Sequence, residues 1–147
     1  MHRLLLLVIA SVLHAQQAAP TIQLSPGDST AIRSKVEQID AAVRAARSKH
    51  VSEDLIADVD VYAKAGKWVL EFPEDLFVAD DVKHTLAVLD TGIERAHELE
   101  SGKSPWAEKK RKRVHGYYSA LDGSVQPYAV TIPESYDGTG MLNARSI

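Results

Sequence analysis

The first long stretch of helical periodicity lies between Ser25 and Lys49. Its apolar positions recur every three or four residues, which places them on one face of an α-helix. They are Ile32, Val36, Ile39, Val43 and Ala46. Ser25, Pro26 and Asp28 provide a capping side chain, a proline at the first helical position and an acid in the first turn. The pattern therefore predicts a helix that begins after Ser25 and ends near Lys49.

A second helix is predicted after Ser52, where Glu53 and Asp54 place negative charge in the first turn. Its apolar positions are Leu55, Ile56, Val59, Tyr62, Val69 and Leu70. Gly66 weakens its second half by about 1 kcal/mol relative to alanine, so the helix can break or bend there. The proline of the Phe72-Pro73 pair ends it.

The third predicted helix has the longest apolar stripe. The stripe consists of Val78, Val82, Leu86, Leu89, Ile93 and Ala96. Asp80 and Asp81 lie in its first turn, where the helix dipole favours acids, and Gly102 follows as a stop. Because three such stripes can bury one another, residues 25–102 are predicted to form a helical region with a core of its own.

Two β-prone segments follow, separated by Asp122-Gly123. This pair is typical of a two-residue type I′ hairpin turn, which would place Tyr117 opposite Tyr128 and His115 opposite Val130. Pro127 would then face Tyr118 at a position that makes no ladder hydrogen bond. An isolated hairpin is marginally stable in water, so its edges must dock on the helices or on another chain.

These elements predict an α+β fold in which a three-helix N-terminal region precedes a β-hairpin. We divide the chain into residues 25–102 as the helical region, 103–112 as a basic linker, 113–136 as the hairpin and 137–147 as a disordered tail. The remaining N-terminal residues have a different character.

Residues 1–15 have the layout of a signal peptide, because Arg3 precedes a run from Leu4 to Leu13 that is apolar except for Ser11, and Ala15 follows. The run is well short of the ~20 residues that span a bilayer, so no stable membrane anchor is expected. Cleavage after Ala15 would leave residues 16–24 as a flexible leader. The expected location is therefore outside the cytoplasm, secreted or periplasmic.

Composition adds few constraints. The chain has 147 residues, of which 45% are hydrophobic and 25% charged, an ordinary composition for one globular domain. It has no cysteine, so packing has to stabilise the exported protein without disulfides. After removal of Arg3 with the signal peptide, 16 basic and 20 acidic residues remain, which does not favour general binding to nucleic acid.

Four segments of the sequence carry a resemblance to a known family. They run from Ser104 to Trp106, from Val114 to Ser119, from Leu121 to Tyr128 and from Val130 to Tyr136. Together they resemble the entry into the catalytic domain of secreted bacterial α/β-hydrolases of the prolyl-oligopeptidase-like group. The resemblance spans about residues 53–138. It implies that the helices are an accessory region and that the hairpin forms the opening strands of an α/β-hydrolase sheet, which is incomplete here. Where such hydrolases continue with a third strand and a His-Gly turn, this sequence reads Gly138 to Ile147. The catalytic residues of the group therefore have no counterpart in this chain.

None of the candidate chemical motifs in the sequence has all the residues that its chemistry requires. Gly102-Lys-Ser-Pro-Trp106 lacks the second glycine of a serine nucleophile elbow and follows a helix, so Ser104 is interpreted as a loop residue. The same segment lacks the first glycine of a phosphate-binding loop, because His97 stands there. No catalytic, cofactor-binding or metal-ligating residue is assigned, and no cofactor is expected.

The histidines that remain after cleavage are His50, His84, His97 and His115, and they show no metal-ligand spacing. His97 is expected to complement the dipole at the end of the third helix, and His115 to pack on the hairpin face that carries Tyr117. Asp58 and Asp60 begin like a calcium loop without its later ligands, and are interpreted as the solvated face of the second helix.

The basic run from Lys109 to Arg113 could bind phosphates, but a solvated linker is favoured. Pairing of the run with the acids Glu94, Glu98 and Glu100 stays open as an alternative. Two functions stay open. The first is the exported N-terminal part of a prolyl-oligopeptidase-like hydrolase, which by resemblance is a serine peptidase or esterase. This part is expected to be inactive alone and to pair with its own missing catalytic domain. The second is a small secreted helical binding module whose hairpin edge receives another chain.

Overall fold

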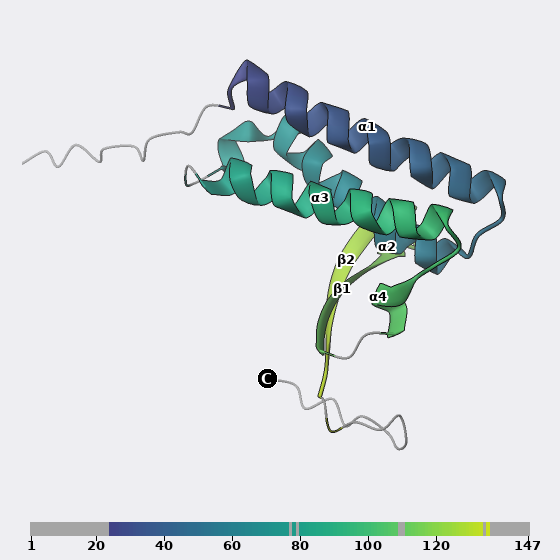
Figure 1. Ribbon diagram of the computed structural model, residues 1–147. Coiled ribbons are helices and arrows are strands. Elements are labelled where there is room, and N and C mark those ends of the chain that lie inside the picture. The colour runs from purple at the N-terminus through teal and green to yellow at the C-terminus, as the bar shows by residue number, and fades with distance from the viewer. Residues whose placement is uncertain (1–23, 77, 79, 109–110, 134, 136–147) are drawn as a thin grey trace, which may run out of the picture.

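The computed structural model describes residues 24–76, 78, 80–108, 111–133 and 135, and it confirms the α+β class (Figure 1). The elements in chain order are α1 (Pro26–Ser48), α2 (Glu53–Glu71), the 3₁₀ turn η1 (Pro73–Asp75), α3 (Asp80–Glu100), α4 (Pro105–Glu108), β1 (Arg111–Tyr118) and β2 (Val125–Ile132). The three long helices pack side by side, and the hairpin projects from α2 (Figure 1). The predicted signal peptide, the leader up to residue 23 and the tail 137–147 lie outside the described residues.

The ends of the helices follow the sequence signals. The Ser25 side chain accepts a hydrogen bond from the Asp28 amide at 3.0 Å, which caps α1 as predicted. Asp80 and Asp81 lie in the first turn of α3. Gly102 follows this helix with φ of 72°, and its amide donates to Leu99 while that of Lys103 donates to Glu98. These two bonds satisfy carbonyl groups that the last turn would otherwise leave without a partner.

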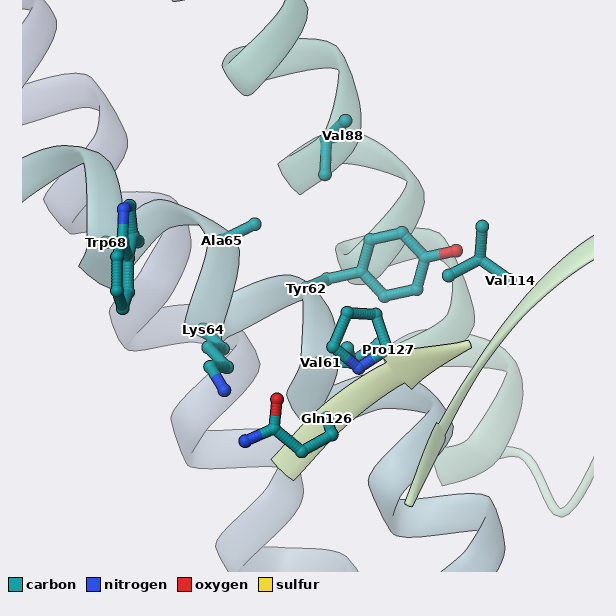
Figure 2. A pocket seen from close by; sticks show the side chains of 9 residues that line it. All are labelled: Val61, Tyr62, Lys64, Ala65, Trp68, Val88, Val114, Gln126 and Pro127. Carbon is teal, nitrogen blue, oxygen red and sulfur yellow. The ribbon is translucent and has the colours of Figure 1, made fainter. Parts of the chain in front are cut away.

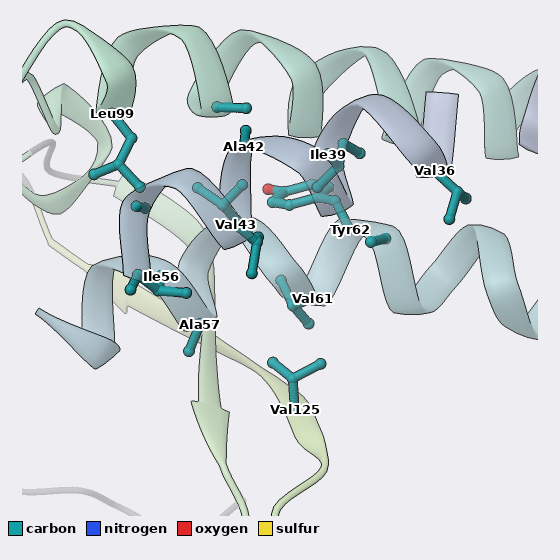
Figure 3. Close-up of a cluster of buried hydrophobic side chains, with 14 of the residues drawn as sticks. Val36, Ile39, Ala42, Val43, Ile56, Ala57, Val61, Tyr62, Leu99 and Val125 are labelled. Atoms are coloured by element: carbon teal, nitrogen blue, oxygen red, sulfur yellow. The ribbon is translucent and has the colours of Figure 1, made fainter. Parts of the chain in front are cut away.

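The core lies between the three helices and extends to the hairpin (Figure 3). All five residues of the predicted α1 stripe are buried, from Ile32 to Ala46. Trp106 of α4 and Val125 of β2 join the same cluster. Helix α2 does not break at Gly66, because it continues to Glu71. A Cβ atom on Gly66 would lie 2.5 Å from a methyl group of Val36, so the glycine lets α1 approach α2 closely.

The hairpin forms, but its predicted register is wrong by two residues. His115 pairs with Tyr128, Tyr117 pairs with Gln126, and Pro127 pairs with Gly116 instead of Tyr118. The two-residue turn is replaced by a four-residue loop, closed by a hydrogen bond from Ser119 N–H to Ser124 O at 2.8 Å. Because a shift of two residues preserves the alternation of side chains, each residue still lies on the face that was predicted.

The segment predicted as a basic linker is partly structured. Helix α4 occupies Pro105–Glu108, with Trp106 buried, and β1 already begins at Arg111. The guanidinium of Arg113 donates to the carbonyl oxygens of Trp106 and Ala107, at 3.1 and 2.6 Å. One cation of the basic run therefore holds α4 beside the start of the hairpin.

Candidate functional site

The hairpin is attached to the helices through the carboxylate of Asp58, in the second turn of α2. This side chain is buried, with 4% exposure, so its interpretation as part of a solvated face is wrong. Its Oδ1 accepts a hydrogen bond from the Gly116 amide at 2.8 Å, and its Oδ2 accepts one from the Trp106 indole at 3.1 Å. Nδ1 of His115 lies 2.9 Å from Oδ2. A buried carboxylate needs such partners, and here they come from α4 and β1.

Gly116 allows the strand to approach α2 this closely. A Cβ atom at this position would lie 2.0 Å from the carbonyl oxygen of Ala57. Any side chain would therefore push the strand away from the helix and lengthen the bond from the Gly116 amide to Asp58.

Arg95 of α3 forms the second part of the attachment. Its guanidinium donates to the carbonyl oxygens of Asp58 and Val114, at 3.1 and 2.9 Å, and so connects α2, α3 and β1. The rings of Tyr62 and Trp106 lie 4.9 and 5.4 Å from the guanidinium carbon. Burial raises the pKa of the Tyr62 hydroxyl, and the charge of Arg95 partly opposes this rise.

Asp60, two residues after Asp58 in α2, makes a separate contact with the hairpin. The Tyr118 hydroxyl donates to Asp60 at 2.9 Å and accepts from the Arg47 guanidinium at 2.6 Å. Burial and the hydrogen bond to Asp60 raise the pKa of Tyr118 well above its usual value. The neutral tyrosine therefore connects α1, α2 and β1. The helix residues Asp58, Asp60 and Arg95 thus all bond the hairpin, Asp60 through Tyr118. We call these contacts together the hairpin joint.

The Asp58–His115 pair resembles the acid and base of a hydrolytic triad, since a carboxylate oriented toward Nδ1 fixes the tautomer of the imidazole. Such a base acts only when a nucleophile lies within hydrogen-bond reach of its other nitrogen. Among the described residues, the contacts of His115 are Asp58 and the ring of Tyr128, stacked at 5.4 Å. Asp58 also holds Trp106 and Gly116. The arrangement therefore fixes the hairpin and shows no nucleophile beside the base.

The other sequence candidates lie apart from the joint. Ser104 is in the loop before α4, as interpreted from the sequence, and His97 lies in the last turn of α3. His50 follows α1, and His84 is exposed on α3. Within the part of the chain that the structure describes, no group of three or more histidine, aspartate or glutamate side chains could hold a metal ion.

An open apolar groove lies between the hairpin, α2 and α3, with a cavity volume of about 450 Å³ (Figure 2). Its floor and walls come from Val61, Tyr62, Ala65, Trp68, Val88, Val114 and Pro127, with Lys64 and Gln126 at one end. Trp68 is 52% exposed although it lines this groove. The groove has the apolar character of a binding surface and few polar groups for chemistry.

The outer face of the hairpin is the second exposed apolar surface. Tyr117 and Tyr128 are 49% and 45% exposed, and their ring centres lie 6.0 Å apart. The inner face, by contrast, is covered by α2 at Gly116 and Val125. The hairpin is therefore covered by α2 on part of its inner face, where Val114 is still 39% exposed, and is open at Tyr117 and Tyr128 on the outer face.

Sequence analysis did not identify the role of Asp58, although the sequence contains a signal for it. From Ile56 to Ala63 the helix is apolar on nearly every side, which is typical of a buried helix. An acid on the most buried side of such a segment is buried with it, as Asp58 is, whereas Asp60 stays partly exposed. Its partners Trp106, His115 and Gly116 lie at least 48 residues away in the sequence, and local spacing does not predict them.

Comparison with known proteins gives no relative to guide the interpretation of these surfaces. No family model matches the chain, and neither a curated protein nor a solved structure is significantly similar to it. None of the described helices has the length and apolarity that a membrane span needs. Functional inference therefore rests on the residues of the joint, the groove and the exposed hairpin face.

Proposed function

We propose that this chain is the exported N-terminal part of an α/β-hydrolase of the prolyl-oligopeptidase-like group, and that it supports a catalytic domain without catalysing a reaction itself. The resemblance of residues 104–136 to the entry of that domain motivates the proposal. The observation that carries it is the hairpin joint, which fixes a two-stranded ribbon firmly while its aromatic face stays exposed. A fixed ribbon with one open face suits the opening strands of a larger sheet.

The chemistry of the described residues supports the proposed absence of catalysis. The buried Asp58–His115 pair has no nucleophile within reach, and Ser104 lies in a loop without the strained elbow that exposes a nucleophilic serine. In the proposed complete enzyme, the serine, histidine and acid that the resemblance implies belong to the catalytic domain. The substrate would be a peptide or an ester.

The proposal is tested with the purified mature chain, an activated p-nitrophenyl ester and a fluorophosphonate that labels reactive serines. We expect no turnover above the rate of a Ser104→Ala variant and no labelled serine. Turnover that the fluorophosphonate abolishes would show that the chain is itself a hydrolase. The coding DNA beyond the codon for Gly140 provides an independent test, because an apolar strand and a His-Gly turn in any frame support the hydrolase origin. A downstream region without them contradicts it.

Export is tested separately. The proposed location is the periplasm or the medium, and the N-terminal sequence of protein recovered there is expected to begin at Gln16. Recovery only from the cytoplasm, with residues 1–15 retained, would contradict export.

The apolar groove favours a second candidate, a small secreted binding module whose hairpin edge receives a partner protein. Size-exclusion chromatography of the mature chain separates the two functions. A dedicated module is expected to be a soluble species of defined size, whereas an isolated part of a larger sheet is expected to aggregate through its uncovered face.

A further inference from the structure

We propose that the groove between the hairpin, α2 and α3 binds a medium-chain aliphatic carboxylate, whose carboxylate group accepts a hydrogen bond from the Tyr62 hydroxyl. The acyl chain of this ligand would lie along the apolar walls of the groove. The inference goes beyond the proposed function and does not depend on it. It rests on a tyrosine hydroxyl that the described residues bury without bonding it.

Tyr62 is 8% exposed, yet its hydroxyl makes no hydrogen bond with any residue that the structure describes. A buried tyrosine hydroxyl ordinarily has a partner, because an unpaired buried donor is costly. Tyr62 lines the groove, and Figure 2 shows its hydroxyl directed toward Val114. A ligand in the groove can therefore reach this hydroxyl and accept its hydrogen bond.

The ring of Tyr62 is held in place from the side of α3. A Cβ atom on Gly92 would lie 2.5 Å from the Cβ atom of Tyr62, so the glycine lets the tyrosine lie close against this helix. The guanidinium carbon of Arg95 lies 4.9 Å from the centre of the ring. The hydroxyl therefore has a fixed direction before a ligand arrives, which lowers the entropic cost of binding.

The other polar side chains that line the groove already have partners. The ammonium group of Lys64 and the amide of Gln126 donate to neighbouring hairpin residues at 2.7 Å each, and the indole of Trp68 donates to Asp75 at 3.3 Å. The rest of the lining is aliphatic and consists of Val61, Ala65, Val88, Val114 and Pro127. Such a surface suits a ligand with one polar end and an apolar body. A peptide would bring an N–H and a C=O group at nearly every residue, and the groove lacks partners for them.

The charges around Tyr62 favour an anionic polar end. Burial raises the pKa of the Tyr62 hydroxyl, so the hydroxyl stays protonated at neutral pH and can donate. Of the two charges that act on it, Arg95 lowers this pKa more strongly than Asp58 raises it. The field at the hydroxyl is therefore positive, and it stabilises a carboxylate more than an alcohol or an ammonium group.

The ligand test uses the purified chain with decanoate as the probe. Decanol and decylammonium are the matched ligands, because they change only the polar end. Calorimetric titration measures affinity, and a blue shift of tryptophan emission reports on Trp68 in the groove. We expect saturable binding of decanoate, about tenfold weaker binding of decanol and still weaker binding of decylammonium. Equal affinities for decanoate and decanol would overturn the inference, because the charge of the ligand would then have no effect.

Tyr62→Phe keeps the ring and removes only the hydroxyl. It should weaken decanoate binding about tenfold, because a hydrogen bond to a charged group is lost. Without ligand, its urea midpoint should equal that of the unmodified chain or exceed it, since the hydroxyl bonds no described residue. Tyr118→Phe is the matched control, because the Tyr118 hydroxyl bonds Asp60. The control should lower the urea midpoint and leave decanoate binding unchanged.

Three further outcomes would overturn the inference. Unchanged decanoate affinity in Tyr62→Phe would show that the hydroxyl does not hold the carboxylate. A fall in the urea midpoint of Tyr62→Phe as large as that of Tyr118→Phe would show that the hydroxyl is satisfied within the fold. A dimer that forms with rising chain concentration and excludes decanoate would assign the groove to a second copy of the chain.

Discussion

The helical core and the hairpin joint are held together by different kinds of contact. In the core, apolar side chains from α1, α2 and α3 interdigitate, and residues such as Ile32, Ile39 and Leu89 are fully buried. In the joint, a carboxylate, a guanidinium and backbone groups of β1 satisfy one another inside the protein. Apolar packing tolerates changes of shape that preserve volume, whereas a buried polar network requires each partner. The difference predicts which substitutions separate the hairpin from the helices.

The largest effect is expected for Asp58→Ala. It leaves the Gly116 amide, the Trp106 indole and His115 without their shared acceptor, which should lower the free energy of unfolding by roughly 3–5 kcal/mol. Urea unfolding followed by circular dichroism measures the loss, and hydrogen exchange at Gly116 should accelerate with it. Glu94→Ala on the exposed side of α3 is the control and should change stability by less than about 0.5 kcal/mol. Equal effects of the two substitutions would show that the joint contributes no special stability.

The next effect is expected for Gly116→Ala, which changes no hydrogen-bonding side chain. The new Cβ would meet the carbonyl of Ala57, so the strand has to move and stability should fall by roughly 2–3 kcal/mol. Gly123→Ala is the matched control in the loop, where φ is 69° and no atom lies within 4 Å of the new Cβ. It should cost only about 1 kcal/mol, from backbone strain. Near-ultraviolet circular dichroism of Trp106 should change for Gly116→Ala and not for the control.

A smaller effect is expected at high pH. The pKa of Tyr118 is raised in the folded protein, so its contribution to stability is fully present below the unfolded pKa near 10 and is lost as the pH rises above that value. Unfolding in urea at about pH 8 and about pH 11 measures the loss. Tyr118→Phe should lower stability by about 1 kcal/mol at the lower pH, because the bond to Asp60 is lost. The variant should then lose less on going to the higher pH than the unmodified chain. An equal loss in both would show that Tyr118 is not the titrating group.

The contrast between the apolar core and the polar joint also explains how much of the structure the sequence predicts. The helices and most of their buried stripes follow from local spacing, and the caps at Ser25 and Gly102 follow from single residues. Val78 of the third predicted stripe is the exception, because it lies before α3 and is 55% exposed. The faces of the hairpin also follow from alternation, but its register does not, because a shift of two residues satisfies the same alternation. The Asp122 carboxylate accepts from the amide and the hydroxyl of Ser124, which stabilises the longer loop.

The joint could not be predicted because its partners are distant in the sequence and polar. Spacing identified Asp58 as one of two acids on a helix, and only the fold brings it to Trp106 and Gly116. The groove depends in the same way on the angle between hairpin and helices. Local pattern therefore predicts the core and the elements, whereas the candidate binding surfaces depend on the tertiary arrangement.

The smallest effect is expected for a substitution in the helical region, just after the C-terminal end of α1. His50 follows α1 with φ of 56°, and its amide donates to Arg47 while that of Val51 donates to Ala46. This is a left-handed helix end that glycine adopts without strain, so His50→Gly should raise stability by about 0.5–1 kcal/mol. Lys49→Gly is the control and should be destabilising, because Lys49 has a negative φ of −89°. Because neither residue bonds Asp58 or Gly116, hydrogen exchange at Gly116 should slow only as far as global stability rises. A larger change there would show that the core and the joint are coupled more tightly than their separate contacts imply.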